Sequence, residues 1–223
     1  MKRFNTMIYG LSLALIGAGL ASATPILTPG LTVTSGPATF SHFGCTFSNA
    51  GMTSGACSQV DVAAAPVPTG LVFSALDLST RGISSVDESL FFDVSSTAPI
   101  SAIGLSFNSS YFGLNVNSVT EDVYTSAAMT DLVGTVTVWC SNITGCSSTT
   151  TASIALTGGS YSSLYVDKDI ILSGYATTDL GELSIIGQTF TTTSTPEPVT
   201  MSLIGGGLAL MGLVRLRRNK SKS

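Results

Sequence analysis

The chain has 223 residues, only 10% of them charged, and a formal net charge of −4. This charge is unevenly distributed: residues 24–195 contain two cationic and twelve acidic side chains, a balance of −10, and the other cations lie in the two ends. A body this acidic repels phosphate backbones, which argues against nucleic-acid binding and leaves divalent cations, sugars and other proteins as partners. Its length suits one domain with a sizeable core.

The first 23 residues have the pattern of a secretory signal. Lys2 and Arg3 form the positive start, and Met7 to Leu20 form the apolar middle. Ala21 and Ala23 are the small residues of a signal cleavage site, so we expect the mature chain to begin at the next residue.

Residues 24–190 have the composition of an all-β domain. Short apolar runs alternate with turn residues, and about ten to twelve short strands follow one another at intervals of roughly eight to twelve residues. This spacing predicts a two-layer β-sandwich with a jelly-roll-like topology. We expect a signal helix at one end of the chain and a transmembrane helix at the other, and within the body only one short helix, over Val119–Met129.

The strand pattern is clearest in Leu132–Cys140, where the side chains of two faces alternate. We expect its Trp139 to be a core residue packed on a disulfide. Ile100–Phe107 shows a similar half-buried alternation, and we expect Tyr111–Val116 to pair back across a turn at Asn108–Ser110.

The chain has four cysteines, Cys45, Cys57, Cys140 and Cys146. An even number in an exported chain favours disulfides. Of the three pairings we favour Cys45–Cys57 and Cys140–Cys146, because each pair brackets a short loop that contains glycine. Zinc is the competing interpretation, but these spacings do not match paired CxxC knuckles, and no histidine lies near the second pair.

The sequence contains no evident catalytic constellation, so we expect neither enzymatic activity nor a cofactor. A Ser/His/Asp hydrolase would have to use His42, the sole histidine, and no Gly-x-Ser-x-Gly elbow occurs. Glycoside hydrolysis needs two carboxyl groups that face one cleft, whereas sequence neighbours on a strand face opposite ways. The acidic candidates for that chemistry are Asp87, Glu88, Asp93, Glu121 and Asp122.

Clustered oxygens make calcium the better-motivated site. Its candidate ligands are either Asp87, Glu88 and Asp93, or Asp167 and Asp169, although no EF-hand loop accompanies them. Between the last two lies Lys168, which we expect to form a local surface ion pair worth at most about 1 kcal/mol.

Aromatic side chains are the usual platform for sugars. The body supplies Tyr111, Tyr124, Trp139, Tyr161, Tyr165 and Tyr175. A carbohydrate-binding module for exopolysaccharide, with or without structural calcium, is therefore the alternative to a purely structural or interaction role. A polysaccharide hydrolase is the third hypothesis.

The last 28 residues combine three features behind a Thr-rich spacer at residues 191–195. Pro196, Glu197 and Pro198 come first, and an uncharged apolar helix candidate follows at residues 199–214. At about 1.5 Å per residue this helix is slightly shorter than a hydrocarbon core of about 30 Å. The basic tail, residues 215–222, begins with the stop-transfer cations Arg215, Arg217 and Arg218, which predict a cytoplasmic C-terminus.

The order of these parts resembles the C-terminal sorting signal of bacterial PEP-CTERM proteins, the substrates of exosortases. The resemblance covers residues 196–223 and says nothing of the body. It implies export, transient anchoring in the inner membrane, and cleavage near Pro196–Pro198 by an exosortase. Release to the cell surface or to an exopolysaccharide matrix, as in a biofilm, would follow, whereas an uncut single-span anchor is the alternative. We therefore expect an exported, non-enzymatic protein with a structural or interaction role.

Overall fold

The computed structural model describes residues 22–65, 69–74, 76, 78–141, 145–146 and 151–193, with the backbone alone at 52–54 and 145–146. This part of the chain is built from strands and one 3-10 turn, which confirms the all-β prediction. The elements are β1 (Thr24–Pro25), β2 (Val33–Ser35), β3 (Ala38–Ser54), η1 (Cys57–Gln59), β4 (Asp61–Ala64), β5 (Gly70–Ser74), β6 (Leu78–Phe112), β7 (Asn115–Tyr124), β8 (Leu132–Ser141), β9 (Gly145–Cys146), β10 (Thr151–Ala155), β11 (Tyr161–Gly174) and β12 (Leu180–Thr192).

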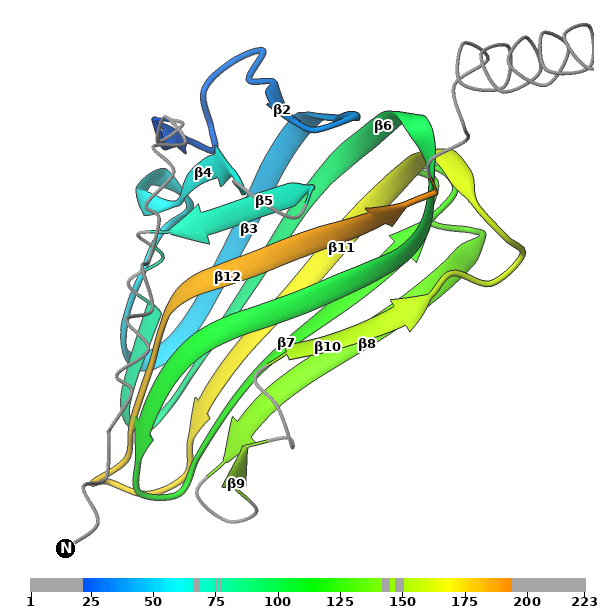
Figure 1. The fold of residues 1–223 in the computed structure, drawn as a ribbon. Helices are drawn as coiled ribbons and strands as arrows, with labels where there is room; N and C mark the ends of the chain where they lie inside the picture. The colour runs from blue at the N-terminus through cyan, green and yellow to red at the C-terminus, as the bar shows by residue number, and fades with distance from the viewer. Residues whose placement is uncertain are drawn as a thin grey trace, which may run out of the picture.

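The strand β6 belongs to both layers of the fold (Figure 1). Between Ser84 and Ser96 it pairs with β3 on one side and β11 on the other, and its first residues, up to Arg81, pair with β3 and β12. From Ile100 to Phe112 it pairs with β12 and with β10. Pro99 lies between the two parts, where a residue without an N–H interrupts the ladder at little cost.

The strands form two layers that share β6. The first has the order β2-β3-β6-β11-β7-β8-β9, and the second has the order β1-β4-β5-β12-β6-β10. In Figure 1, β12 and the second part of β6 cross in front of β3 and β11. The predicted two-layer, jelly-roll-like sandwich is thus confirmed in outline.

Aromatic rings join the two layers in the core. Phe40 of β3 lies 5.3 Å from Phe190 of β12, and Phe92 of β6 lies 5.8 Å from Phe73 of β5, measured between ring centroids. All four side chains are buried. Because burying one such ring contributes about 1.5–3 kcal/mol, this cluster is a main source of cohesion between the layers.

Two local predictions are wrong. The short helix expected over Val119–Met129 is absent, because β7 continues as a strand to Tyr124 with alternating burial. The turn expected at Asn108–Ser110 is also absent, since β6 runs on to Phe112. The chain reverses instead at Gly113, whose φ of +79° suits glycine.

Asp179 joins two connections at the end of the sandwich where β6 terminates. Its carboxylate accepts hydrogen bonds from the backbone N–H groups of Leu114 and Tyr175, both at 2.7 Å, and of Ala176 at 2.6 Å. Desolvation acts to raise the pKa of Asp179, but these three donors lower it below its ordinary value. The carboxylate therefore ties the turn after β6 to the connection between β11 and β12.

The strand predicted at Leu132–Cys140 is confirmed as β8, but Trp139 has a different environment from the one expected. Val136 and Val138 are buried, whereas Trp139 is half-buried and lies opposite Ser118 of β7. The prediction that Trp139 is a core residue is therefore wrong, because alternation along β8 points it outward.

The predicted targeting segments lie almost entirely outside the described residues. These segments are the signal peptide up to residue 21 and the sorting signal at residues 196–223. In the part of the chain that the structure describes, no helix is long and apolar enough to cross a membrane. β12 extends to Thr192, so the first two residues of the predicted spacer belong to a strand.

Candidate functional site

The outward side of the first layer gathers acidic and aromatic side chains from three adjacent strands. Each is half-buried or exposed, and its neighbours along the strand point inward and are buried. We call this set the acidic–aromatic face: Asp87, Ser89, Phe91 and Asp93 of β6, Asp122 and Tyr124 of β7, and Tyr165, Asp167 and Asp169 of β11.

The strand register arranges these side chains in rows. Asp167 lies between Phe91 on one neighbouring strand and Asp122 on the other. In the next row, Tyr165 lies between Asp93 and Tyr124. Directly opposed side chains have Cβ atoms about 4.5–5.5 Å apart, so the rings and carboxylates of each row lie at contact distance across the face.

Phe91 and Tyr165 form a stacked pair of rings, the aromatic platform of this face. Their ring centroids are 6.4 Å apart and their planes differ by 28°. The Phe91 ring also lies over Gly44 of β3, where an added Cβ would come within 2.3 Å of a ring carbon. Sequence reasoning missed both Phe91 and Gly44, although Phe91 shares its side of β6 with two candidate aspartates.

Hydroxyl groups orient two carboxylates of the face. Ser89 Oγ donates to Asp167 Oδ1 at 2.7 Å, and Thr135 Oγ1 donates to Asp122 Oδ1 at 2.6 Å. A carboxylate accepts up to about four hydrogen bonds, so both retain acceptor capacity for a ligand.

Burial and the accumulated negative charge raise the pKa of three groups on the face, Asp169, Tyr165 and Tyr124. Burial, followed by the charges of Asp87 and Asp167, raises the pKa of Asp169. Burial together with Asp167 and Asp93 also raises the pKa of Tyr165. The negative potential disfavours anionic ligands and leaves neutral hydroxyl-rich or cationic ones.

His42 lies beside the face at a bulge in β3. Its φ of +52° falls in the left-handed region, and the pairing of β3 with β6 shifts between Ser41 and Gly44. His42 Nδ1 donates to Asp93 Oδ2 over 2.8 Å, while its own side chain remains 81% exposed. The bulge thus directs the ring toward the edge of the face, since such irregularities re-aim side chains.

The structure separates the members of the first set of calcium candidates, Asp87, Glu88 and Asp93. Glu88 points into the core, whereas Asp87, Asp93, Asp167 and Asp169 point outward. On the acidic–aromatic face, no three described carboxylates bring ligand oxygens within 4.8 Å of one another. The first predicted set is therefore inconsistent with the strand geometry, whereas Asp167 and Asp169 share the outward side but are joined by no third described carboxylate within that distance.

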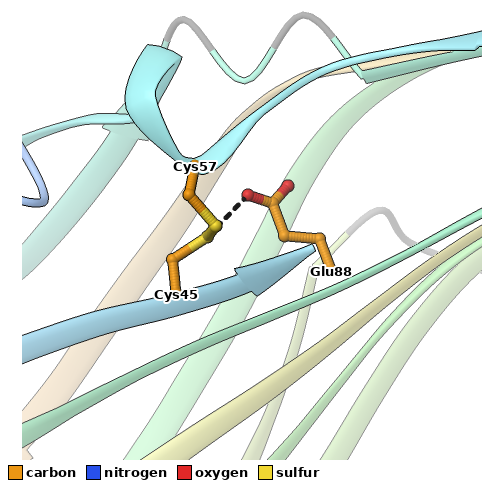
Figure 2. Close-up of side chains that lie close together, drawn as sticks. All are labelled: Cys45, Cys57 and Glu88. Carbon is orange, nitrogen blue, oxygen red and sulfur yellow. Dashed lines mark hydrogen bonds between the residues drawn. A yellow bond between two sulfur atoms is a disulfide. The ribbon is translucent and has the colours of Figure 1, made fainter. Parts of the chain in front are cut away.

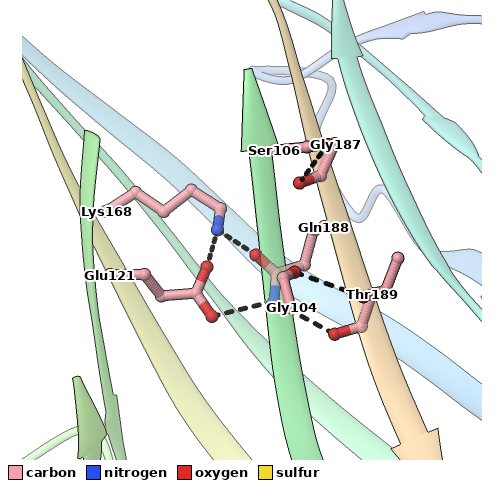
Figure 3. Close-up of polar contacts among 7 residues, drawn as sticks. All are labelled: Gly104, Ser106, Glu121, Lys168, Gly187, Gln188 and Thr189. Atoms are coloured by element: carbon pink, nitrogen blue, oxygen red, sulfur yellow. Dashed lines mark hydrogen bonds and ion pairs between the residues drawn. The ribbon is translucent and has the colours of Figure 1, made fainter. Parts of the chain in front are cut away.

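Lys168 does not form the surface ion pair predicted for it. Its side chain is fully buried between the layers, where Nζ donates to Glu121 Oε2 and to Gln188 Oε1 (Figure 3). Gln188 Nε2 donates to Glu121 Oε1 at 2.8 Å, which closes the buried triad of Lys168, Glu121 and Gln188. Because the triad takes one residue each from β11, β7 and β12, it links the two layers.

Burial acts on both charges of the buried triad. It lowers the pKa of Lys168 and raises that of Glu121, and in each case contact with the other partner opposes the shift. The Lys168 ammonium also lies 5.8 Å from the ring centroid of Phe92 and 6.0 Å from that of Phe73. Glu121 is thus enclosed in the core, which removes it as a hydrolase candidate.

The first predicted disulfide, Cys45–Cys57, is confirmed and joins β3 to η1 (Figure 2). A disulfide leaves no thiolate for the competing zinc interpretation at this pair. Cys140 is disulfide-bonded as well, and the residue opposite it in the register of β8 and β9 is Cys146. The Cys146 side chain lies outside the description, so the second pairing remains a prediction.

A second surface feature lies on the other layer, where β12, β6 and β10 run side by side. It is a depression of about 330 Å³ lined by hydroxyl groups and small residues, among them Gly104, Ser106, Ser153 and Thr189. No aromatic side chain lines it. Figure 3 shows Gly104 and Thr189 at this site close to Gln188 of the buried triad.

No family model and no curated protein matches this chain. A solved structure of TmCBM61 in complex with beta-1,4-galactotriose is similar at 13% identity and a TM-score of 0.30, covering 63% of this chain and 88% of that one. CsCBM6-3 from Clostridium stercorarium, in complex with cellobiose, is similar at 16% identity and a TM-score of 0.20, covering 66% and 95%. The enzymatically active domain of tailspike protein 4 of bacteriophage CBA120 is similar at 10% identity and a TM-score of 0.31, and the match covers 67% of this chain and 19% of that one. These likenesses are distant, and they carry no functional weight beside the side chains described above.

Proposed function

We propose that this chain is an exported carbohydrate-binding protein and that its acidic–aromatic face is the sugar site. The supporting observation is the stack of Phe91 and Tyr165, with Phe91 over Gly44 and with Asp122 and Asp167 beside the stack. A sugar ring offers an apolar C–H face to an aromatic ring and hydroxyl donors to carboxylates. Apolar platforms with a few fixed polar groups are typical of small-ligand sites.

The proposed action is binding without catalysis. Glycoside hydrolysis requires two carboxyl groups, one of them with a raised pKa, on either side of the scissile bond. The former candidates Glu88 and Glu121 are both buried. The remaining carboxylates of the face, among them Asp169 with its raised pKa, lie on an open strand surface that does not enclose a bond between two of them. Incubation with bound polysaccharide should therefore release no reducing ends.

The two ends of the chain support the proposed route. The signal peptide would direct export and be cleaved after Ala23, and exosortase cleavage near Pro196–Pro198 would then release the body from a transient inner-membrane anchor. The Cys45–Cys57 disulfide suits an oxidising compartment. At the cell surface, or in a biofilm matrix, the sugar face would meet exopolysaccharide.

The route is tested by the fate of a C-terminal epitope in strains with and without an exosortase. The epitope should be lost from the exported protein only where the exosortase is present. Equal retention in both strains would contradict the sorting proposal and leave the sugar site untouched.

The sugar site is tested by binding of the mature chain to arrays of matrix polysaccharides and of neutral β-linked galactose and glucose oligosaccharides. Replacing Tyr165 by alanine should weaken binding about tenfold, because one of the two rings of the aromatic platform is lost. Tyr175→Ala is the matched control, since Tyr175 is 60% exposed and lies in the connection between β11 and β12, outside the face. Binding should survive a chelator, and no binding to any glycan would leave a structural role alone.

A further inference from the structure

A buried carboxyl group lies against the Cys45–Cys57 disulfide (Figure 2). Glu88 extends inward from β6, is fully buried, and places Oε1 3.1 Å from Sγ of Cys45. A disulfide sulfur carries no proton, so a hydrogen bond across this distance requires a protonated Glu88 to donate it.

The surroundings of Glu88 favour the protonated form of its carboxyl group. Among the described residues, its second oxygen, Oε2, has no hydrogen-bond partner. Its neighbours in register, Phe47 on β3 and Ile170 on β11, are apolar, and η1 contributes Cys57 of the disulfide itself. The other buried charges have partners of their own: Lys168 and Glu121 bind each other, and Asp179 accepts backbone hydrogen bonds. Burial accordingly raises the pKa of Glu88 to about 7.

The disulfide lies at the boundary between solvent and core. Cys45 and Cys57 are both half-buried, whereas Glu88 has no exposed surface. A thiol reagent can therefore approach the sulfurs from outside while the carboxyl contacts Cys45 from the interior. Few structural disulfides need a titratable group at this position, because an apolar side chain would pack there without the cost of burying a carboxyl.

We propose that Cys45–Cys57 is a thiol-exchange site in which Glu88 donates a proton to the departing sulfur of Cys45. The substrate class is a dithiol reductant. Its first thiolate attacks Sγ of Cys57, the Cys45–Cys57 bond breaks, and Sγ of Cys45 takes the electron pair and the proton of Glu88. The second thiolate then displaces Cys57 and closes the reductant into a disulfide, and Cys57 takes a proton from water. Two electrons pass from the reductant to the protein.

The charge of Glu88 controls this exchange. When Glu88 is protonated, negative charge developing on Cys45 is neutralised by proton transfer. When Glu88 is ionised, that charge develops 3.1 Å from a carboxylate in a poorly solvated site, and bond breaking is opposed. The rate constant of reduction, corrected for the concentration of reductant thiolate, should thus be high at low pH and low at high pH. The thiolate fraction of the reductant itself changes in the opposite direction.

The test is the reduction of Cys45–Cys57 in the mature chain by dithiothreitol, from about pH 5.5 to about pH 8.5, a range that brackets the titration of Glu88. Alkylation and peptide mass measurement follow this disulfide separately from the other cysteines. The rate constant, corrected for dithiothreitol thiolate, should fall at least about tenfold with rising pH, as expected for one pKa unit of differential interaction.

Two variants separate proton donation from a general effect of pH. Glu88→Gln should give a flat corrected profile, because the amide has no proton to lose in this range. Asp87→Asn, which changes the adjacent outward carboxylate, should keep the wild-type fall. A flat wild-type profile, or the same fall in Glu88→Gln, would overturn the proposal. The wild-type profile alone decides the matter if Glu88→Gln does not fold.

Discussion

Acidic side chains on the two faces of β6, β11 and β7 have opposite environments, solvent on one face and the core on the other. On the outward face, carboxylates such as Asp122 and Asp167 keep contact with solvent and are oriented by hydroxyl groups. On the inward face, Glu121 is paired with Lys168, and Glu88 lies against a disulfide. Because side chains alternate along a strand, one step in sequence separates a ligand-accessible acid from one enclosed in the core.

The inward polar groups should therefore determine the stability of the fold, and the outward ones the affinity for a ligand. The inward polar groups hold the two layers together and depend on their partners, since a buried charge without a partner is costly. The outward groups contribute little to folding and remain available to a ligand. Substitutions on the inward face should therefore change stability most, and substitutions on the outward face should change affinity.

The largest effect is expected from Lys168→Met. It leaves Glu121 buried without its cation and should lower the free energy of unfolding by about 3–5 kcal/mol. Urea denaturation at neutral pH measures this loss. Asp167→Asn, one residue away on the outward face, is the matched control and should change stability by less than about 0.5 kcal/mol.

A double variant sharpens the same comparison. Adding Glu121→Met to Lys168→Met removes the uncompensated charge, so most of the lost stability should return. A loss below about 1 kcal/mol for Lys168→Met alone would show that Glu121 finds another partner or water, contrary to the closed triad described above.

Removing the Cys45–Cys57 disulfide should have the next largest effect. The two cysteines are 12 residues apart in sequence, and closing a loop of this size stabilises a fold by about 3 kcal/mol in the chain-entropy account. Cys45→Ser with Cys57→Ser should lose about this amount in urea denaturation. An unchanged midpoint would mean that β3 and η1 are held in place without the bond.

The raised pKa of Glu88 predicts a stability that depends on pH. Its value of about 7, against an ordinary 4.5, means that between these pH values the folded chain keeps a proton that the unfolded chain has lost. Stability from this group is complete below about pH 4.5, falls by about 2–3 kcal/mol as pH rises to about 7, and then levels off. In Glu88→Gln the free energy of unfolding should not fall in this way with pH. Urea denaturation of both proteins between about pH 4.5 and 7 measures the difference. The same fall in both proteins would contradict the assignment to Glu88.

A smaller effect is expected from Gly44→Ala on the outward side. The new Cβ would lie 2.3 Å from a carbon of the Phe91 ring, which would have to move out of its stack with Tyr165. Losing one aromatic pair is worth about 1 kcal/mol, so sugar affinity should fall about fivefold. Isothermal titration measures this change, and undiminished affinity in a stably folded variant would show that the stack is not part of the site.

Much of the fold could be predicted from sequence because strand periodicity is a local signal. The all-β class, the strand β8 and the Cys45–Cys57 pair follow from alternation and from cysteine spacing. The turn predicted at Asn108–Ser110 is wrong because cross-strand pairing extends β6 through these residues, which favour turns in isolation. Such pairing is not encoded in any short window.

The candidate site was less predictable because it depends on register between strands. Alternation alone indicates that Lys168 shares a face with Val166 and Ile170, and applying it would have placed the lysine in the core. Its partners Glu121 and Gln188 are 47 and 20 residues away, so sequence spacing gives no hint of the triad. The stack of Phe91 on Tyr165 likewise exists only once β6 and β11 are paired.

The most direct test of the sugar site is a titration of the isotopically labelled mature chain with the neutral oligosaccharide that binds best, followed by NMR. Backbone amides of outward residues in β6, β7 and β11 should shift together, centred on Phe91, Asp167 and Tyr165, with saturation at one common affinity. Shifts confined to the depression around Gly104, or no saturable shifts with any oligosaccharide, would contradict the assignment of the acidic–aromatic face as the sugar site.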